Sequence, residues 1–235
     1  MPRKRTKNPR LSDRDWMIFE HILRYRITVP EILHRLYFDD SEPNAVTKVT
    51  SRLCKHGFLA RHDFLSQRSY YTLGTEACKI LGVSRKKTDA LGSQALTTEF
   101  GTLAFCFQAT PERYRLRVSD LQKRDETLLG KGLNSSHYYF DVTEEAQRLG
   151  MIRVEQGSTP SHIVRKCEHE LNKRLAFPSF KNLIENDQFL IAIVTSTIQK
   201  HDQIHIQLRK KNWGIKFRIA VVPELIQLNA RGRGI

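Results

Sequence analysis

One segment limits the fold more than any other, because a helix pattern ends in it and two strand patterns follow at once. Residues 43–56 carry apolar side chains at helical spacing, and Gly57 is the residue type that most often stops a helix. Residues 58–62 and 69–73 then show the alternation typical of strands, with Ser66-Gln67 between them. The segment is therefore predicted to form a helix that leads directly into a β-hairpin.

Two further helices are expected before this segment and one after it. Ser12 and Asp15 have the spacing of an acidic capping box at the start of a helix with a broad apolar face. Pro30 suits the first turn of a second helix. Residues 75–81 give a short helix behind the hairpin. Three helices, a hairpin and a trailing helix together predict a winged helix-turn-helix over residues 12–82.

The charge of the chain favours a polyanionic partner. The 235 residues include 39 Lys+Arg against 25 Asp+Glu, a formal net charge of +14, and such a balance favours nucleic acid first. The alternative is a basic but otherwise ordinary protein. Four well-separated cysteines without a CxxC pair give no support for a metal cluster. The absence of an 18-residue apolar run argues against a membrane span, so we expect a cytoplasmic protein.

The third helix is short enough to enter a major groove, and the hairpin beside it can reach the flanking backbone. The basic arm at residues 1–11 is either a solvated tail or a segment that lies on phosphates. The alternative for the whole unit is a winged helix that contacts only proteins. The predicted DNA-binding residues lie on the arm, the third helix and the hairpin: Arg3, Lys4, Arg5, Asn44, Thr47, Lys48, Ser51, Arg52, Lys55, Arg61, Gln67 and Arg68.

A second domain is predicted over residues 93–230, behind a basic linker at 83–92. It opens with an apolar helix at 93–108, and residues 113–133 are either helix or loop. The elements expected after them are strands at 137–143, 151–155, 188–196 and 215–223, a helix at 161–176, and a helix or strand at 197–211. The runs at 188–196 and 215–223 are apolar enough for strands buried on both faces. This order gives an α/β or α+β layer, and the chain as a whole is predicted to be α+β.

The order of elements in the second half resembles the restriction-endonuclease-like core. The signature of that core is an Asp, then an acidic residue, one spacer and a Lys, which hold a magnesium ion and stabilise charge. Asp141 and Glu155 occupy the acidic positions, but Gly157 stands where the lysine belongs, and Lys166 could substitute only from the following helix. We therefore expect no catalytic residues, no metal and no cofactor, with Asp141, Glu155 and Lys166 as the candidates if the core is active.

The chain as a whole resembles the replication-relaxation family of bacterial mobile elements. The resemblance rests on LSDRDWMIFEHILRYRITVPEILHRLYF, RLCKHGFLARH and YYTLGTEACKILG, which span about the first 82 residues. RVEQG, FLIAIVTS and FRIAVVPEL extend it more loosely into the second half. The resemblance implies control of plasmid or transposon DNA by a winged helix joined to a nuclease fold that is often catalytically silent.

These observations predict a sequence-specific protein that binds double-stranded DNA, most simply a transcriptional regulator of a mobile element. The alternatives are a magnesium-dependent endonuclease and a non-catalytic accessory factor in DNA relaxation, replication or transposition. A homodimer is expected, because two copies on a palindrome improve discrimination, and the second half is expected to hold it together. The apolar stripe of Ile163, Cys167, Leu171 and Leu175 is either part of that interface or internal core.

Overall fold

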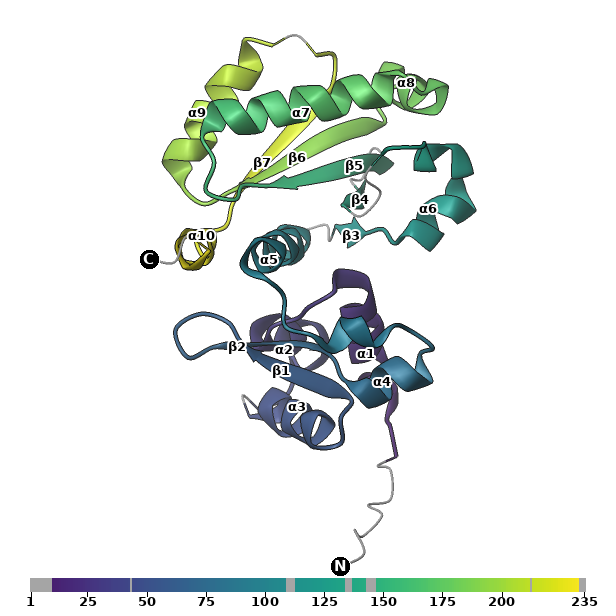
Figure 1. The fold of residues 1–235 in the computed structure, drawn as a ribbon, viewed down its shortest axis with the longest axis vertical. Coiled ribbons are helices and arrows are strands. Elements are labelled where there is room, and N and C mark those ends of the chain that lie inside the picture. The colour runs from purple at the N-terminus through teal and green to yellow at the C-terminus, as the bar shows by residue number, and fades with distance from the viewer. Residues whose placement is uncertain are drawn as a thin grey trace, which may run out of the picture. The chain divides into compact units, whose positions relative to one another are not determined.

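The structure, a computed structural model, describes residues 10–42, 44–108, 113–133, 137–142, 147–211 and 213–232. The chain divides into two compact units, Met1–Ala90 and Leu91–Ile235. Helices and strands occur in both units, which confirms the predicted α+β class (Figure 1). No helix in the described part of the chain combines the length and the apolar character needed to cross a membrane.

The first unit packs its helices around a two-stranded hairpin. Its elements are α1 (Asp13–Tyr25), α2 (Pro30–Tyr37), α3 (Ala45–Lys55), β1 (Leu59–Asp63), β2 (Ser69–Leu73), α4 (Thr75–Ile80) and the 3-10 turn η1 (Arg85–Thr88). The capping box predicted at the start of α1 is confirmed, because Ser12 accepts from the backbone N–H of Asp15 and Asp15 accepts from the backbone N–H of Ser12. Gly57 follows α3 with a φ of 72°, a conformation that glycine adopts without strain.

The predicted hairpin is present, with Ser66-Gln67 between its strands. β1 and β2 pair antiparallel from Leu59↔Leu73 to Asp63↔Ser69. Ser66 and Gln67 occupy the tip with φ values of 42° and 67°, the left-handed pair that matches the twist of a two-stranded ribbon. Buried side chains from all four helices and both strands form one core beneath the hairpin.

The segment expected as a linker belongs in large part to the first unit. Arg26 donates from Nη1 to the carbonyl oxygen of Lys87 at 2.6 Å and from Nη2 to that of Lys86 at 2.8 Å. Thr72 on β2 also donates to the carbonyl oxygen of Thr88 at 3.1 Å. These bonds hold η1 against the rest of the first unit. Most of the segment 83–92, which was expected to be a linker, therefore belongs to that unit, which ends at Ala90.

The second unit is built on a five-stranded mixed sheet. Its helical elements are α5 (Ser93–Phe107), α6 (Val118–Arg124), the 3-10 turn η2 (Glu126–Leu129), α7 (Pro160–Leu175), α8 (Pro178–Glu185), α9 (Ile198–Arg209) and α10 (Leu225–Arg231). Its strands are β3 (Tyr114–Arg115), β4 (Tyr138–Val142), β5 (Gln147–Val154), β6 (Phe189–Thr195) and β7 (Lys216–Val221). The strand order is β3-β4-β5-β6-β7, antiparallel as far as β5 and parallel from β5 to β7.

Helices cover both faces of this sheet (Figure 1). α7, α8 and α9 lie on one face and share a core with the side chains that β4, β5 and β6 point toward them. α5 lies on the other face, with Phe105 edge-on to Tyr139 at 5.0 Å between ring centroids, and α10 packs against α5. β6 lies within the sheet with every residue buried, as the continuous apolar run predicts.

One expectation for the second unit is corrected, and two alternatives that the sequence left open are resolved. β7 is only partly buried along its length, because it is the edge strand and has a neighbour on one side only. Leu175 is 41% exposed, while Ile163, Cys167 and Leu171 are buried in the core, so the stripe on α7 is internal packing. Residues 198–209 form a helix, which settles the open choice at 197–211. Helices α8 and α10 were not expected at all.

The four cysteines are free thiols. Cys78, Cys106 and Cys167 are buried, whereas Cys54 on α3 is half-buried. Burial raises the pKa of Cys106 and of Cys167 to about 12. These two thiols are therefore protonated and packed as small apolar groups.

Candidate nucleic-acid interface

The outward face of α3 is polar and exposed, and residues 45–55 include no Asp or Glu. The exposed residues of this face are Asn44, Thr47, Lys48, Ser51 and Lys55. Lys48, Arg52 and Lys55 follow one another at spacings of four and three, which places them along one side of the helix. Within the part of the chain that the structure describes, the ammonium groups of Lys48 and Lys55 form no ion pair. Both cations are therefore available to an anionic partner.

Arg61 brings a third cation from the hairpin to the same region. It is exposed on β1, and its Nε donates to Ser69 Oγ on β2 at 2.7 Å. β1 packs against α3, and the chain bends directly from one element into the other (Figure 1). Burial raises the pKa of Cys54 near the end of α3, and the positive charge of Arg61 offsets part of that rise. α3 and β1 thus present one basic surface.

Gln67 and Arg68 lie at the hairpin tip, and they differ in whether their side chains are available to a partner. Gln67 is exposed at the second left-handed position of the turn. Arg68 is already engaged, because its Nη2 lies 2.8 Å from Glu31 Oε1 and its guanidinium lies over the ring of Phe64 at 5.5 Å. The structure therefore leaves Gln67 available at the tip and directs Arg68 toward α2.

Arg52 was predicted to contact DNA, but in the structure it forms an ion pair within the first unit. Its Nη2 donates to Asp15 Oδ1 at 2.6 Å, and Asp15 is only 1% exposed. Asp15 also accepts from the backbone N–H of Ser12 at 2.9 Å through its other oxygen. The arginine thus neutralises a buried carboxylate and ties α3 to the first turn of α1.

The N-terminal end of α3 has the opposite charge. Asp39, Asp40 and Glu42 precede the helix and are exposed. Carboxylates at that end favour the helix dipole, and basic residues in the last turn do the same. They also repel phosphates, so the part of this surface best suited to an anionic partner runs from Lys48 through the last turn of α3 to Arg61 on β1. The predicted arm residues Arg3, Lys4 and Arg5 lie outside the described residues.

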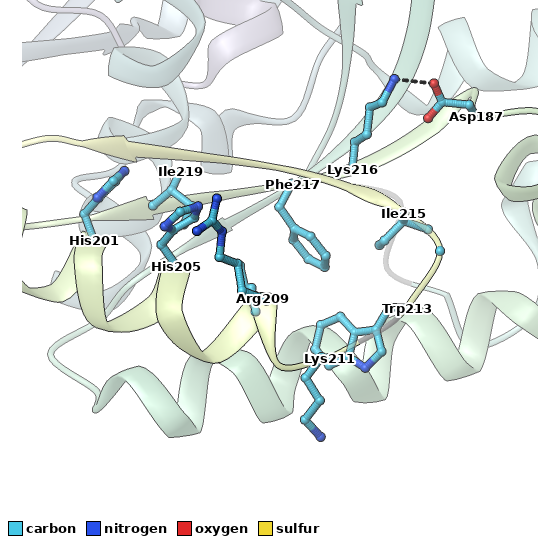
Figure 2. A pocket seen from close by; sticks show the side chains of 12 residues that line it. Asp187, His201, His205, Arg209, Lys211, Trp213, Ile215, Lys216, Phe217 and Ile219 are labelled. Carbon is cyan, nitrogen blue, oxygen red and sulfur yellow. Dashed lines mark hydrogen bonds and ion pairs between the residues drawn. The ribbon is translucent and has the colours of Figure 1, made fainter.

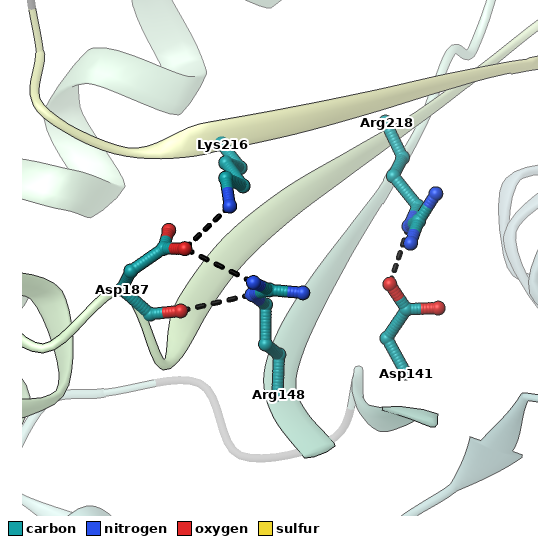
Figure 3. A network of polar contacts seen from close by, with 5 residues as sticks. All are labelled: Asp141, Arg148, Asp187, Lys216 and Arg218. Carbon is teal, nitrogen blue, oxygen red and sulfur yellow. Dashed lines mark hydrogen bonds and ion pairs between the residues drawn. The ribbon is translucent and has the colours of Figure 1, made fainter. Parts of the chain in front are cut away.

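In the second unit, Asp141 on β4 is buried among arginines and is 4% exposed. Its carboxylate pairs with the guanidinium of Arg218, which reaches it from β7 across the intervening strands (Figure 3). Arg113 Nε lies 3.5 Å from its other oxygen. Two cations already compensate this carboxylate.

Glu155 is equally buried, at 1% exposure, and has its own partners. Ser196 Oγ donates to Glu155 Oε2 at 2.8 Å, and Lys200 Nζ donates to Oε1 at the same distance. Ser196 follows β6, and Lys200 lies in the first turn of α9. Glu155 therefore joins the ends of β5 and β6 to the start of a helix.

The structure does not bring the three nuclease candidates together. Asp141 pairs in register with Arg148, and Glu155 comes seven residues further along the chain, which at about 3.3 Å per strand residue is roughly 23 Å. Lys166 is exposed on α7 and lines a cavity of about 390 Å³ with Arg153 and His162, a cavity that neither Asp141 nor Glu155 lines. Among the residues that the structure describes, no group of three His, Cys, Asp or Glu side chains is placed to hold a metal ion.

The residues that satisfy these carboxylates were missed from the sequence. Arg113 and Arg218 lie far from Asp141 along the chain, and only the strand order reveals the pairing. Lys200 carried a weak signal, because it lies in the first turn after a fully buried strand, where side chains meet those at the ends of neighbouring strands.

No protein-family model matches the chain, and no match was found among curated proteins or among solved structures.

Proposed function

We propose that the chain is a sequence-specific protein that binds double-stranded DNA, and that its first unit is a winged helix. The observation that carries this proposal is the carboxylate-free face of α3, where Lys48 and Lys55 have no ion-pair partner among the described residues and Arg61 lies alongside. A helix with an exposed polar face fits a B-form major groove, and a hairpin beside it fits the adjoining backbone. The net charge of +14 supports the same class of partner.

The positions of the side chains suggest a division of labour on DNA. Thr47 and Ser51 lie in the middle of the exposed face, where a helix in the groove meets base edges, and Lys48 beside them can reach a base edge or a phosphate. Lys55 and Arg61 lie toward the end of α3 and on the hairpin, where phosphates pass. Arg52 contributes mainly by fixing α3 on α1, and its remaining N–H groups can reach a phosphate.

The wider role follows from the sequence resemblance. We propose a regulator of a plasmid, transposon or other mobile element, with a nuclease-like second unit that is not catalytic. In support, Asp141 and Glu155 each have a complete set of cationic or hydroxyl partners and lie at different ends of β5. A homodimer remains part of the proposal, and sedimentation of the intact protein at micromolar concentration tests it.

Site selection from random duplex DNA, followed by binding measurements on the selected site, tests the proposal. We expect Lys48→Ala to weaken binding and, if the lysine meets a phosphate, to flatten the dependence of log affinity on log salt by about one. The matched control is Lys79→Ala, an exposed lysine on α4 that lies outside the α3 surface. Failure to enrich any sequence, or equal affinity of the wild type and Lys48→Ala, would refute the assignment of α3.

A further inference from the structure

A pocket of about 560 Å³ opens between α9 and the edge strand β7 of the second unit (Figure 2). Its volume is typical of sites for small organic ligands. The side chains that matter most come from α9 and β7 and from the connection between them: His201, His205, Arg209, Trp213, Ile215 and Phe217. None of the residues proposed for duplex DNA lies in it.

The apolar part of the pocket includes two aromatic rings that pack against the core of the second unit. The rings of Trp213 and Phe217 lie 5.4 Å apart between centroids at an angle of 53°. Both side chains are partly buried and pack against the main core of the unit. Lys211 lies over the indole at 5.8 Å, and an ion pair with Glu168 at 2.9 Å holds that lysine in place. The rings are therefore fixed but still accessible to a planar group.

The polar part of the pocket consists mainly of basic residue types. Figure 2 shows His201, His205 and Arg209 projecting from α9 toward β7. The acidic residue that lines the pocket, Asp187, is already neutralised by Lys216 and by Arg148 Nη2 at 3.0 Å (Figure 3). Among the described residues, the guanidinium of Arg209 makes no hydrogen bond or ion pair. The pocket thus lacks a free carboxylate and offers an unused bidentate donor for an anion.

We propose that this pocket binds a nucleotide. The aromatic base stacks on Trp213 or Phe217, and the phosphate accepts hydrogen bonds from Arg209. Aromatic rings beside an unpaired arginine suit a ligand that combines a flat π-surface with a negative charge, and a nucleotide has both. The same chemistry is found in a free nucleoside monophosphate and in an unpaired residue of single-stranded DNA.

A second copy of the chain fits this surface less well. Two copies related by a two-fold axis through the pocket would bring the guanidinium of Arg209 against that of the partner. Like charges facing one another oppose association. The charge of the pocket therefore favours an anionic ligand over self-association.

The chain carries a built-in probe of this site, because Trp16 and Trp213 are its two tryptophans. In the full-length Trp16→Phe variant, the fluorescence of Trp213 reports on the pocket alone. We would titrate this variant with thymidine and adenosine 5′-monophosphates, with the corresponding nucleosides, and with a short oligothymidylate. We expect a saturable change in the fluorescence of Trp213 with the phosphorylated ligands, and binding at least about tenfold weaker for the nucleosides.

Variants decide whether the pocket is the site. Arg209→Ala should raise the dissociation constant about tenfold or more, because a charged hydrogen-bond partner is lost. Phe217→Leu should raise it at least about fivefold through lost stacking, and a thermal melt confirms that this variant is folded. The control is Lys210→Ala, which removes an exposed charge next to Arg209 that does not line the pocket.

Saturation by monophosphates would identify a free nucleotide as the ligand, and saturation by the oligonucleotide alone would identify single-stranded DNA. No saturable change with any of them up to about 5 mM would overturn the proposal. Equal dissociation constants for the parent and Arg209→Ala would overturn it as well. So would a change in Trp213 fluorescence that depends on the protein concentration and not on the ligand concentration. Duplex binding through α3 is measured separately with Lys48→Ala, so either proposal can fail alone.

Discussion

The clasp between Arg52 and Asp15 gives the sharpest prediction for the first unit. Arg52→Ala removes the donor that lies 2.6 Å from Asp15 Oδ1 and leaves a carboxylate that is 1% exposed with one bond, from the backbone N–H of Ser12. The substitution should therefore destabilise the unit, whatever it does to DNA binding. The sequence alone predicts only the loss of a DNA contact.

The size of the effect follows from the burial of the two partners. Removing one member of a fully buried pair costs about 3–5 kcal/mol, because the remaining charge is left uncompensated. The side chain of Arg52 is 36% exposed, so water screens the pair and can reach the carboxylate after the substitution. We expect a loss of about 2 kcal/mol in the free energy of unfolding. For a unit of this size, that loss lowers Tm by roughly 8–16 °C.

Urea or thermal unfolding followed by tryptophan fluorescence measures this loss, with Trp213→Phe leaving Trp16 as the reporter in the first unit. Lys48→Ala is the matched control, because an exposed and unpaired lysine should change stability by less than about 0.5 kcal/mol. A double-mutant cycle with Asp15→Asn isolates the pairwise energy. If Arg52→Ala lowers stability by no more than the control while it weakens DNA binding, then Arg52 is a DNA contact and the clasp is incidental.

Three further predictions concern other parts of the molecule. Burial first, and then the charge of Arg24, lower the pKa of His21 from 6.5 to about 3, so below pH 6.5 the unfolded state binds the proton first and stability falls. At pH 4.5 this costs about 2–3 kcal/mol, and His21→Gln should remove that part of the pH dependence of urea unfolding. A side chain at Gly150 would overlap the ring of Tyr139, so Gly150→Ala should destabilise the second unit by at least about 1–3 kcal/mol in a thermal melt. Supercoiled plasmid incubated with the protein and magnesium should stay intact, and nicking that disappears in Asp141→Ala would contradict the proposal of a silent nuclease core.

Local signals account for what could be predicted from the sequence. Ser12, Gly57 and the Ser66-Gln67 turn act within a few residues of themselves, and the elements that they bound were predicted almost to the residue. A run such as residues 188–196 also identifies a strand, because it is apolar on both alternating faces. Helix α8 was missed although Pro178 stands in its first turn, a signal that could have marked its start.

The order of the strands in the sheet could not be predicted from the sequence patterns. The run at 215–223 is as apolar as many central strands, but β7 pairs on one side only and is therefore half-exposed. The partner of Asp141 is 77 residues away along the chain, and no spacing rule connects them. The pocket between α9 and β7 was missed for the same reason, because its aromatic and basic residues meet only at an exposed edge of the sheet.

The two carboxylates that first suggest a nuclease are better explained by how the sheet is held together. Asp141 joins β4 to β7 through Arg218, and Glu155 joins the end of β5 to α9 through Lys200. A magnesium ion at either carboxylate would have to displace a cation that the fold already supplies. Among the described residues, no group of three His, Cys, Asp or Glu side chains is placed to hold such an ion. Gly157 stands where the endonuclease-like signature has a lysine, and the arginine and lysine partners neutralise the charge that a metal site would use. In this structure both acidic residues therefore stabilise the second unit, which agrees with our proposal that the unit is not catalytic.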